Sequence, residues 1–492
     1  MKPDQKPMVV IGGGTAGWLS ALFAKHYYPD TKVIVIASEK IGILGAGEGT
    51  TPSFLPVLRS LNICIEDFVA ECDVTIKNGI VFENWCGKND SYFHSFFINS
   101  ANEFGLPLSV RSGLLAEYSS LDSVSLGQYL NKTKRVFSIY DTKQETAVHF
   151  NAIKMAAYLK KIALKRGIKY IEDTVTDIGF KDNQDIEKIN LEHNDVVYPC
   201  FVFDCSGLKR IFIGGKYNTE WCDYASELTT DSAIPFFIPH NNDVIPATKA
   251  IAMKHGWAWK IPVKNRYGCG YVYDSKKVAE KDVISEIQEF FDIELNDYKK
   301  FNFKAGVYKE VLKNNVLAVG LSSGFIEPLE ATSIWCSTTS LDLFFQSDGV
   351  NNKSNFFAKQ FNKYMFDFNE HIKNFIVAHY QSGRKDTEFW NQFNNLNKNK
   401  MSEEMKSSLN YNIDGSDVLS SSNAFGAWSW SCVLAGTNQL DKDMLQIRAK
   451  DDRDIKKEAL KFLQQNQNGL IFSDTVSHKD FIELKTPPQG LM

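Results

Sequence analysis

The sequence predicts an α/β protein with a Rossmann-like, nucleotide-binding sheet near its N-terminus. Four apolar residues, Met8–Ile11, indicate a buried parallel strand, and a helix-forming run reaches His26. Between them stand three glycines at the Gly-x-Gly-x-x-Gly spacing, which permits a tight turn, close approach of a pyrophosphate and close packing of the helix on the sheet. The free N–H groups at the start of such a helix attract phosphate. The residues expected to bind a dinucleotide are Gly12, Gly14, Thr15, Ala16 and Gly17.

Two further stretches extend this nucleotide site. Residues 32–37 predict the second parallel strand, and Ser38 and Glu39 stand just past its end, where the ribose partner of a bound dinucleotide lies. A glycine-dense loop then offers many backbone donors beside the nucleotide. We expect Gly47 and Glu48 of this loop to contact the cofactor.

The composition excludes several classes of protein. The 492 residues include 55 basic and 59 acidic side chains, a net charge of −4, so we expect no basic surface for nucleic acid. No apolar run reaches the ~18 residues that a membrane helix needs. The N-terminal residues show no signal-peptide pattern, and we therefore expect a cytoplasmic protein that binds no membrane. The nine cysteines include no Cys-x-x-Cys pair, so no metal centre is expected.

Later stretches add strands and a helix to this core. Residues 73–85 have strand character and contain Lys77. Residues 150–167 predict an amphipathic helix, and residues 201–207 predict a buried strand that returns to the first sheet.

The second half of the chain is expected to be mainly helical from about residue 341. The tail after about residue 474 is expected to be extended or loosely held. We expect a discontinuous nucleotide-binding module with an inserted sheet over residues 1–345 and a mainly helical, substrate-covering region over residues 346–492.

A strand over residues 256–262 carries bulky side chains at alternate positions. Trp257, Trp259 and Ile261 would point to one face and form a continuous wall, and Pro262 is expected to end the hydrogen-bond ladder. Periodicity alone favours an ordinary aromatic core strand over a functional wall.

A second short motif indicates a different chemistry. Gly320-x-Ser322-x-Gly324 has the spacing of a hydrolase nucleophile elbow, which needs an acid and a histidine later in the chain. Asp386 and His478 are candidates, but nothing in their surroundings marks them. A cofactor-facing loop is the favoured interpretation.

Two motifs and two single residues resemble the flavin-dependent tryptophan halogenases, over nearly the whole chain. Residues 12–18, Gly-Gly-Gly-Thr-Ala-Gly-Trp, look like that family's FAD loop, and Trp-x-Trp-x-Ile-Pro at residues 257–262 is similar to its diagnostic signature. Lys77 falls where the family's catalytic lysine lies. Glu330, in Glu-Pro-Leu-Glu-Ala-Thr-Ser, falls where its catalytic glutamate lies. The run over residues 379–390 also resembles a family segment, which we interpret as structural.

The resemblance implies an FAD-binding fold of the single-component monooxygenase type, with an added mixed sheet and a C-terminal helical substrate region. It implies that reduced FAD, dioxygen and halide give hypohalous acid, which Lys77 guides to an aromatic substrate while Glu330 stabilises the cationic ring. A separate NAD(P)H flavin reductase would supply the reduced FAD. The other implied site residues are halide contacts at Thr332 and Ser333, substrate contacts at His94, Phe96 and Trp430, and a tunnel wall of Trp257, Trp259, Ile261 and Pro262.

This sequence departs from the family pattern at two places. Where the family has Glu-Ser-Thr-Gly, this chain has Glu-Ala-Thr-Ser over residues 330–333, and the less polar surroundings of Ala331 favour bromide or iodide over chloride. Where the family has paired tyrosines that hold the amino and carboxylate groups of tryptophan, this chain has Trp430-Ser431. That difference argues against free tryptophan and for a simpler indole or phenol.

Two other functions stay open from the sequence. An FAD-dependent aromatic monooxygenase would share the nucleotide fold but would need neither Lys77 nor the tryptophan wall. A non-catalytic flavin-binding protein would need none of Lys77, the tryptophan wall and Glu330. The oligomeric state is left open between a monomer and a homodimer.

Overall fold

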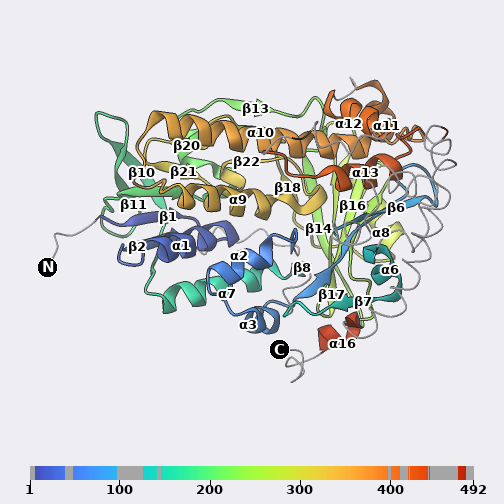
Figure 1. Ribbon diagram of the computed structural model, residues 1–492, viewed down its shortest axis with the longest axis horizontal. Coiled ribbons are helices and arrows are strands. Elements are labelled where there is room, and N and C mark those ends of the chain that lie inside the picture. Colours follow the sequence, from blue (N-terminus) through green and yellow to red (C-terminus); the bar gives the residue numbers. More distant parts are fainter. Residues whose placement is uncertain are drawn as a thin grey trace.

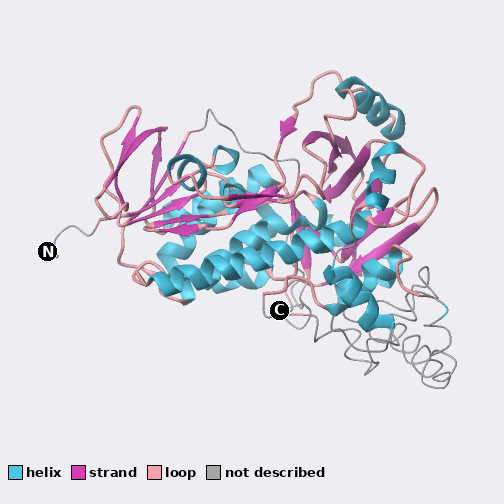
Figure 2. Ribbon diagram, turned by 90° about the horizontal axis from the view of Figure 1, so that it is seen from above, coloured by secondary structure: helices cyan, strands magenta, loops and turns pink. Residues whose placement is uncertain are grey.

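Two large sheets joined by long helices make up most of the described chain. The computed structural model describes residues 6–38, 48–96, 126–140, 146–396, 400–410, 419, 422–441, 443 and 475–483. The two sheets lie towards opposite ends of the molecule, with the longest helices running between them (Figure 1). In the view from above, the strands likewise separate into two groups on either side of the central helices (Figure 2). The α/β fold class with an added mixed sheet is confirmed.

The first sheet is six-stranded and mostly parallel. Its strands are β1 (Met8–Ile11), β2 (Val33–Ala37), β9 (Lys169–Glu172), β12 (Phe201–Asp204), β20 (Leu312–Lys313) and β21 (Val316–Ala318), in the order β20-β21-β12-β1-β2-β9. β1 pairs in parallel with both β2 and β12, so the predicted return of β12 to this sheet is confirmed. All four residues of β1 are buried, as expected for a central parallel strand.

Four helices pack against or beside this sheet: α1 (Thr15–Tyr27), α7 (Ala152–Lys165), α9 (Thr332–Gln346) and α10 (Asn355–Tyr380). The helix predicted over residues 150–167 begins at Ala152, because Phe150 ends strand β8 (Ala147–Phe150). The side chain of Asn151 accepts hydrogen bonds from the backbone N–H groups of Ile153 and Lys154. Asn151 thereby caps the first turn of α7.

The second sheet is mixed and seven-stranded, in the order β18-β14-β17-β16-β15-β5-β6. Its strands are β5 (Gly79–Glu83), β6 (Ser91–Ser95), β14 (Ser232–Pro239), β15 (Thr248–Ala252), β16 (Gly256–Val263), β17 (Arg266–Tyr273) and β18 (Phe301–Asn302). The helix α8 (Glu280–Phe291) packs Val283 and Ile287 against one face of this sheet. The expectation that Pro262 ends the ladder is wrong, because Pro262 pairs with Tyr267 and β16 continues to Val263. Proline is tolerated there because the pairing of β16 with β15 has already stopped at Lys260, so its missing N–H is not needed.

The strand expected over residues 73–85 is divided between two sheets. β4 (Thr75–Lys77) pairs with β8, which also pairs with β3 (Glu48–Gly49), whereas β5 pairs with β15 and β6. Between them, the backbone N–H of Asn78 donates to the carbonyl of Pro246. Lys77 therefore stands at the junction of the two sheets. The smaller sheets comprise β13 (Trp221–Asp223), β19 (Gly306–Tyr308) and β22 (Gly324–Phe325), the pair β10 (Val175–Phe180) and β11 (Ile186–Leu191), and the pair β7 (Arg135–Phe137) and β23 (Thr475–Ser477).

The C-terminal part of the described chain is mainly helical. The remaining α-helices are α2 (Phe54–Ser60), α3 (Ile65–Glu71), α6 (Leu126–Thr133), α11 (Glu388–Asn391), α12 (Lys400–Asn410), α13 (Ala427–Gly436) and α16 (His478–Glu483). Short 3₁₀ turns span Gly207–Lys209, Gly320–Ser322, Leu329–Ala331 and Gln392–Asn395, and a π-helix spans Ile211–Lys216. The expectation of a loose tail is wrong for residues 475–483, because β23 pairs with β7 and Phe481 and Ile482 are buried. The division at residues 345 and 346 stays a prediction.

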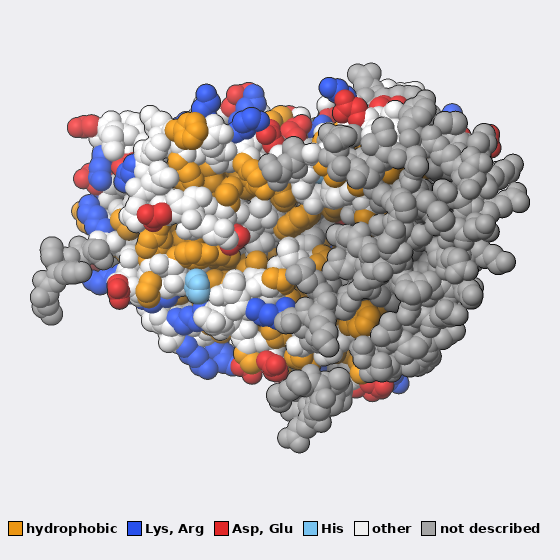
Figure 3. Space-filling view, viewed as in Figure 1, with side chains coloured by type: hydrophobic (Ala, Val, Ile, Leu, Met, Phe, Trp, Pro, Cys, Tyr) orange, Lys and Arg blue, Asp and Glu red, His pale blue; other side chains and the backbone are white. Residues whose placement is uncertain are grey.

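Where Figure 3 shows described residues, basic and acidic side chains are interspersed around apolar ones. Among the described residues, no helix has both the length and the apolar content needed to span a bilayer.

The cysteines are all free thiols, and most are at least partly buried. Burial raises the pKa of Cys205, Cys336 and Cys432 to about 12. Cys64 is the exposed one.

Candidate active site

Three loops meet at the carboxyl ends of β1, β12 and β21. A Cβ on Gly12 would lie 2.1 Å from the carbonyl oxygen of Cys205, and a Cβ on Gly17 would lie 2.0 Å from that of Gly12. Gly320, after β21, has a φ of +73°, and a Cβ there would lie 2.8 Å from the Cβ of Ala16. Glycine therefore lets the three backbones approach each other more closely than a side chain would permit.

Gly14 stands in a different environment from these packing glycines. Apart from its neighbours along the chain, no atom of the described residues lies within 4 Å of the position that a Cβ on Gly14 would occupy. Gly14 is also the N-cap of α1, where no side chain accepts hydrogen bonds from the free N–H groups. The open space and the free donors of the first turn, which includes the buried Thr15, fit a phosphate group.

The acidic residue that the sequence assigns to the cofactor, Glu48, lies in β3. Its Oε2 atom is buried and has no hydrogen-bond partner among the described residues, and burial raises the pKa of Glu48 to about 7. A buried polar atom of this kind is normally satisfied by a ligand or water, so Glu48 fits a cofactor contact. Ser38 directly follows β2 and is partly exposed. Glu39 and Gly47 lie outside the described residues.

Lys77 is a fully buried amine at the end of β4. Its Nζ donates a hydrogen bond to the carbonyl oxygen of Thr50 at 3.1 Å. A Cβ on Gly49 would lie 3.2 Å from this Nζ and 3.6 Å from the Cβ of Ala331, so the amine and the Ala331 loop border the same space. Burial lowers the pKa of Lys77 to about 7, although attraction by Glu330 opposes that shift. Near neutral pH both the neutral and the charged amine are therefore populated.

Glu330 is a buried carboxylate held between two histidines. The Nδ1 of His94 lies 2.9 Å from both carboxylate oxygens, and the Nε2 of His379 lies 3.2 Å from Oε1. The Nδ1 of His379 is in turn 2.6 Å from the hydroxyl of Tyr92. Burial opposes the negative charge, but the attraction of His94 and the hydrogen bonds to both histidines hold the pKa of Glu330 well below its usual range.

The backbone at Glu330 is unusual for residues with side chains. Glu330 and Ala331 have φ angles of 65° and 56°, in the left-handed region. α9 begins at the next residue, Thr332, and no side chain caps its first N–H groups. Thr332 is buried, whereas Ser333 is exposed. Such strain persists where the surrounding structure holds it, and it is common at functional sites.

Aromatic rings surround His94. The rings of Phe96 and Phe375 lie 5.4 Å and 5.6 Å from the imidazole, and the Nζ of Lys77 lies 4.7 Å from the Phe96 centroid. Trp430 packs on Phe375 at 5.1 Å, so it lies behind Phe375 and is fully buried. The structure therefore brings His94, Phe96 and Lys77 together and connects Trp430 to them through Phe375.

The two tryptophans of β16 form a continuous aromatic surface, as their alternate positions predicted. The rings of Trp257 and Trp259 lie 6.2 Å apart, and Trp85 lies 6.4 Å from Trp257. The Trp259 ring covers Gly270 of the neighbouring strand, where a Cβ would lie 2.1 Å from it. Ile261 continues the same face and is buried. The indole nitrogens of both tryptophans are buried without a hydrogen-bond partner among the described residues.

Sequence reasoning missed two buried groups near Glu330. His379 was interpreted as structural, yet it contacts the carboxylate directly. Glu327 accepts hydrogen bonds from the hydroxyls of Tyr380 and Thr230, and burial raises its pKa to about 8. The sequence contains a partial signal for His379 and Glu327, because both residues lie in segments that resemble the family.

The hydrolase elements are not assembled. The hydroxyl of Ser322 donates to the carbonyl oxygen of Asp204 at 2.7 Å, while Asp386 pairs with Arg384. His478 binds the backbone of Ile76. Gly320 of this motif instead packs on Ala16 of the glycine-rich loop, and a cofactor-facing role for the motif stays a prediction.

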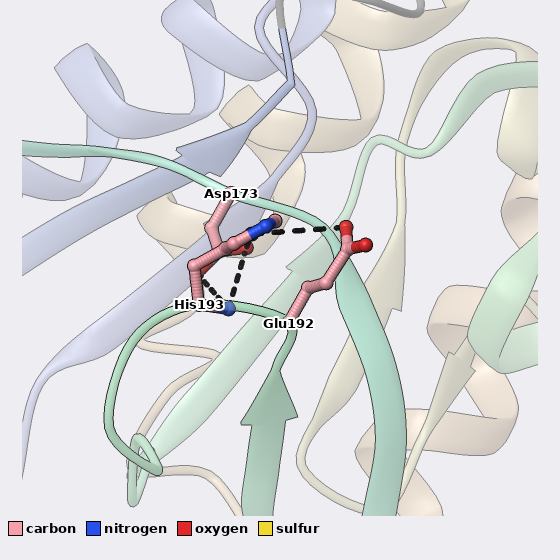
Figure 4. Close-up of side chains that lie close together, drawn as sticks. All are labelled: Asp173, Glu192 and His193. Carbon is pink, nitrogen blue, oxygen red and sulfur yellow. Dashed lines mark hydrogen bonds and ion pairs between the residues drawn. The ribbon is translucent and has the colours of Figure 1, made fainter.

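Asp173, Glu192 and His193 lie close together near β9 and β11 and could resemble a metal site (Figure 4). The Asp173 carboxylate, however, already accepts hydrogen bonds from the N–H groups of Thr174 and His193 and from the side chain of Asn194. These hydrogen bonds connect the end of β9 to the end of β11, which accounts for the close approach of the three side chains. The absence of a metal centre stays a prediction.

Comparison with known proteins assigns the chain to the class of flavin-dependent halogenases. The family model described as tryptophan halogenase matches residues 7–452, and the chain belongs to this family. It is an enzyme that uses reduced FAD and a halide.

Known relatives and solved structures agree with this assignment. The chain is 29% identical to the 7-chloro-L-tryptophan 6-halogenase of Kutzneria sp. (strain 744) over 425 residues, covering 78% of this chain and 81% of that protein. It is also 29% identical to the tryptophan 7-halogenase of Lentzea aerocolonigenes, covering 78% of each. The fold matches the tryptophan halogenase of Shewanella frigidimarina with a TM-score of 0.85 at 23% identity, covering 98% of both chains. It matches a flavin-dependent halogenase of Brevundimonas sp. BAL3 with a TM-score of 0.80 at 21% identity, covering 98% and 99%.

Proposed function

We propose that this enzyme halogenates an indole- or phenol-type ring through Lys77 and Glu330. The observation that carries the proposal is the buried Lys77 amine, which borders the same space as the Ala331 loop and has a pKa lowered to about 7. Reduced FAD, when bound, would give two electrons to dioxygen and so supply the activated oxygen that oxidises halide by two electrons. The residues of this chain then have to deliver the resulting hypohalous acid to the ring and to exclude water.

Lys77 can take up the halogen in its neutral form. The amine nitrogen forms a bond to the halogen of hypohalous acid, the halogen–oxygen bond breaks, and water leaves with the amine proton. The haloamine then gives the halogen to a ring carbon, which loses a proton, and the amine is restored. In its charged form Lys77 would instead donate a hydrogen bond to hypohalous acid and orient it, and either route places the halogen at one point of the ring.

Glu330 supplies a fixed negative charge for the cationic ring. His94 and His379 keep the carboxylate ionised and fix its direction, so little reorganisation is needed when positive charge develops. The halide contacts at Thr332 and Ser333 belong to the same proposal, and the uncapped start of α9 favours an anion there.

The cofactor residues proposed from the sequence fit FAD. The open space at Gly14 and the free N–H groups of α1 suit its diphosphate, and the unpartnered Oε2 of Glu48 suits one of its hydroxyl groups. Ser38, Glu39 and Gly47 complete the proposed contacts. A separate flavin reductase would supply reduced FAD, and we place the enzyme in the cytoplasm, as a monomer or a homodimer.

A substrate simpler than free tryptophan is supported by the hydrogen bonds of α13. The indole nitrogen of Trp430 lies 3.3 Å from the Nε2 of His371, and the hydroxyl of Ser431 donates to the carbonyl oxygen of Ala427. Both side chains are fully buried, so neither offers a group to an amino acid zwitterion. The wall of Trp257, Trp259 and Ile261 would keep the ring apart from the flavin.

Product mass spectrometry tests this proposal. Purified protein is combined with FAD, a flavin reductase, NADH and a panel of indoles and phenols, in separate chloride, bromide and iodide buffers. The expected result is a halide-dependent mass gain that is lost in Lys77→Ala protein, which controls for free hypohalous acid. A gain of oxygen alone would instead support an aromatic monooxygenase.

The halide preference should follow the side chain at residue 331. In mixed halides the wild-type enzyme should give mainly brominated product, because the methyl group of Ala331 offers a weakly polar contact to a large, weakly hydrated anion. Ala331→Ser should increase the ratio of chlorinated to brominated product about fivefold. The serine hydroxyl adds one hydrogen bond to chloride, which is worth about 1 kcal/mol. Mainly chlorinated product from the wild type would contradict this prediction.

Two glycine substitutions should separate cofactor binding from folding. Gly14→Ala should fold with nearly wild-type stability, because its Cβ meets no protein atom, but it should weaken FAD binding about tenfold or more by crowding the diphosphate. Gly17→Ala should instead lower the free energy of unfolding by about 2 kcal/mol or more, because its Cβ would overlap the carbonyl oxygen of Gly12. Urea unfolding and fluorescence titration with FAD measure the two effects, and equal loss of stability in both variants would overturn the assignment.

A further inference from the structure

The strand that carries Lys77 has one edge that no other strand of the described residues covers. β4 lies at the edge of the sheet β3-β8-β4 and pairs with β8 on one side only. Successive N–H groups of a strand point to opposite edges, so the N–H of Ile76 needs a partner on the outer side. That partner is a side chain, because the N–H of Ile76 donates to the Nε2 of His478 at 3.1 Å.

His478 is itself fixed by both of its ring nitrogens. It is fully buried, and its Nδ1–H donates to the carbonyl oxygen of Val244 at 2.9 Å. This bond sets the tautomer in which Nε2 is the acceptor that Ile76 requires. Burial also lowers the pKa of His478 to about 4, so the ring is neutral in the working pH range.

The segment that presents His478 is docked on the structure beside β4. β23 pairs antiparallel with β7, and the guanidinium of Arg135 donates to both the hydroxyl and the carbonyl oxygen of Thr475. The backbone N–H of His478 donates to the carbonyl oxygen of Lys134 at 2.8 Å. A residue some 400 positions after β4 therefore completes the hydrogen bonding of that strand.

We propose that His478 is a positioning residue for Lys77: it holds the outer edge of β4 through the N–H of Ile76, so that the neighbouring amine stays buried against Thr50. The inference rests on the proposed role of Lys77. It assigns the C-terminal segment, residues 475–483, to the active-site machinery although none of its residues contacts the amine in the described structure.

Three substitutions at His478 separate the two hydrogen bonds. His478→Phe keeps the ring volume and removes both bonds. His478→Asn keeps a donor near the Nδ1 position but does not reach Ile76, whereas His478→Gln can extend an acceptor to the Nε2 position. Lys479→Ala, on the exposed side of the same short helix, is the matched control.

Two measurements that do not depend on enzyme turnover report how the His478 substitutions change β4 and Lys77. Hydrogen exchange by mass spectrometry should show the Ile76 amide exchanging at least about tenfold faster in the Phe and Asn variants. Trace labelling with acetic anhydride over a pH series, read on the Lys77 peptide, should show a midpoint raised by about one pH unit, because a looser strand lets water reach the amine. The Gln and Lys479→Ala proteins should match the wild type in both measurements.

Halogenation kinetics complete the test. We expect kcat to fall at least about tenfold in the Asn variant with the aromatic substrate's KM nearly unchanged, and to recover in the Gln variant. An unchanged labelling midpoint in the Asn variant, or a Gln variant that behaves like Asn, would overturn the inference. If wild-type protein halogenates nothing, the proposed function fails, and exchange and labelling still decide whether His478 sets the state of Lys77.

Discussion

Lys77→Met protein will retain FAD but will lose halogenation of the aromatic ring, with kcat reduced by about 10⁴-fold, the upper end of what removing a proton-transfer group costs. Methionine has a similar length and no polar atom, so the packing around β4 is preserved. The substitution removes the amine that borders the Ala331 loop. Product mass spectrometry and a hypohalous acid trap should show oxidant released without coupled product.

The same substitution should make the protein more stable. The pKa of Lys77 is about 7 in the fold and near 10.5 when unfolded, so the unfolded state binds more protons between these values. Stability attributable to this group therefore rises with pH from about 7 to 10.5, and below pH 7 the buried amine costs up to about 5 kcal/mol. Denaturant unfolding of the Met variant should show its largest gain at or below neutral pH. A variant that is both inactive and destabilised would mean that the loss of activity comes from misfolding.

Glu330→Gln protein will lose about 10²–10³-fold in kcat, the cost of removing one preorganised electrostatic group. The amide keeps the shape but removes the charge that His94 and His379 face. Because the pKa of Glu330 is depressed in the fold, its charge stabilises the protein above the unfolded pKa near 4.5, and this contribution is lost as pH falls through the folded value. The wild type should therefore exceed the Gln variant in stability by about 2 kcal/mol at neutral pH, and the difference should shrink in acid.

Glu327→Gln is the matched control for this experiment. Glu327 lies three residues earlier and is equally buried, but its pKa is raised to about 8, so it is largely protonated at neutral pH. Glutamine imitates a protonated carboxyl and can still accept from Tyr380 and Thr230. Its kcat should stay within about threefold of the wild type, well below the effect of a lost electrostatic group. Equal losses in both variants would show that the charge of Glu330 is not what matters.

The features that the sequence could predict were those set by short stretches of chain. The run from Met8 to Gly17 specifies a strand, a turn and a helix start through residues that touch each other, and the alternate tryptophans of β16 needed only the period of a strand. The break at Asn78 could not be predicted, because it depends on which strands β4 and β5 pair with, and those partners lie far along the chain.

The missed members of the site share the same cause. His379 meets Glu330 from a different helix, and His478 reaches Ile76 across 402 positions. Their neighbours in sequence show only that they are buried histidines, which most proteins use for packing. Tertiary contacts decide their roles, and no periodic pattern records such contacts.

The protonation state of the cysteines bears on how this enzyme tolerates an oxidant that it makes itself. Hypohalous acid oxidises sulfur, and thiolates react far faster than thiols. Burial keeps Cys205, Cys336 and Cys432 protonated, with pKa values of about 12, and Cys432 is also buried away from solvent. Cys64, the residue before α3, is exposed, but desolvation and the neighbouring carboxylates raise its pKa as well, so this thiol also stays in the less reactive protonated form at neutral pH.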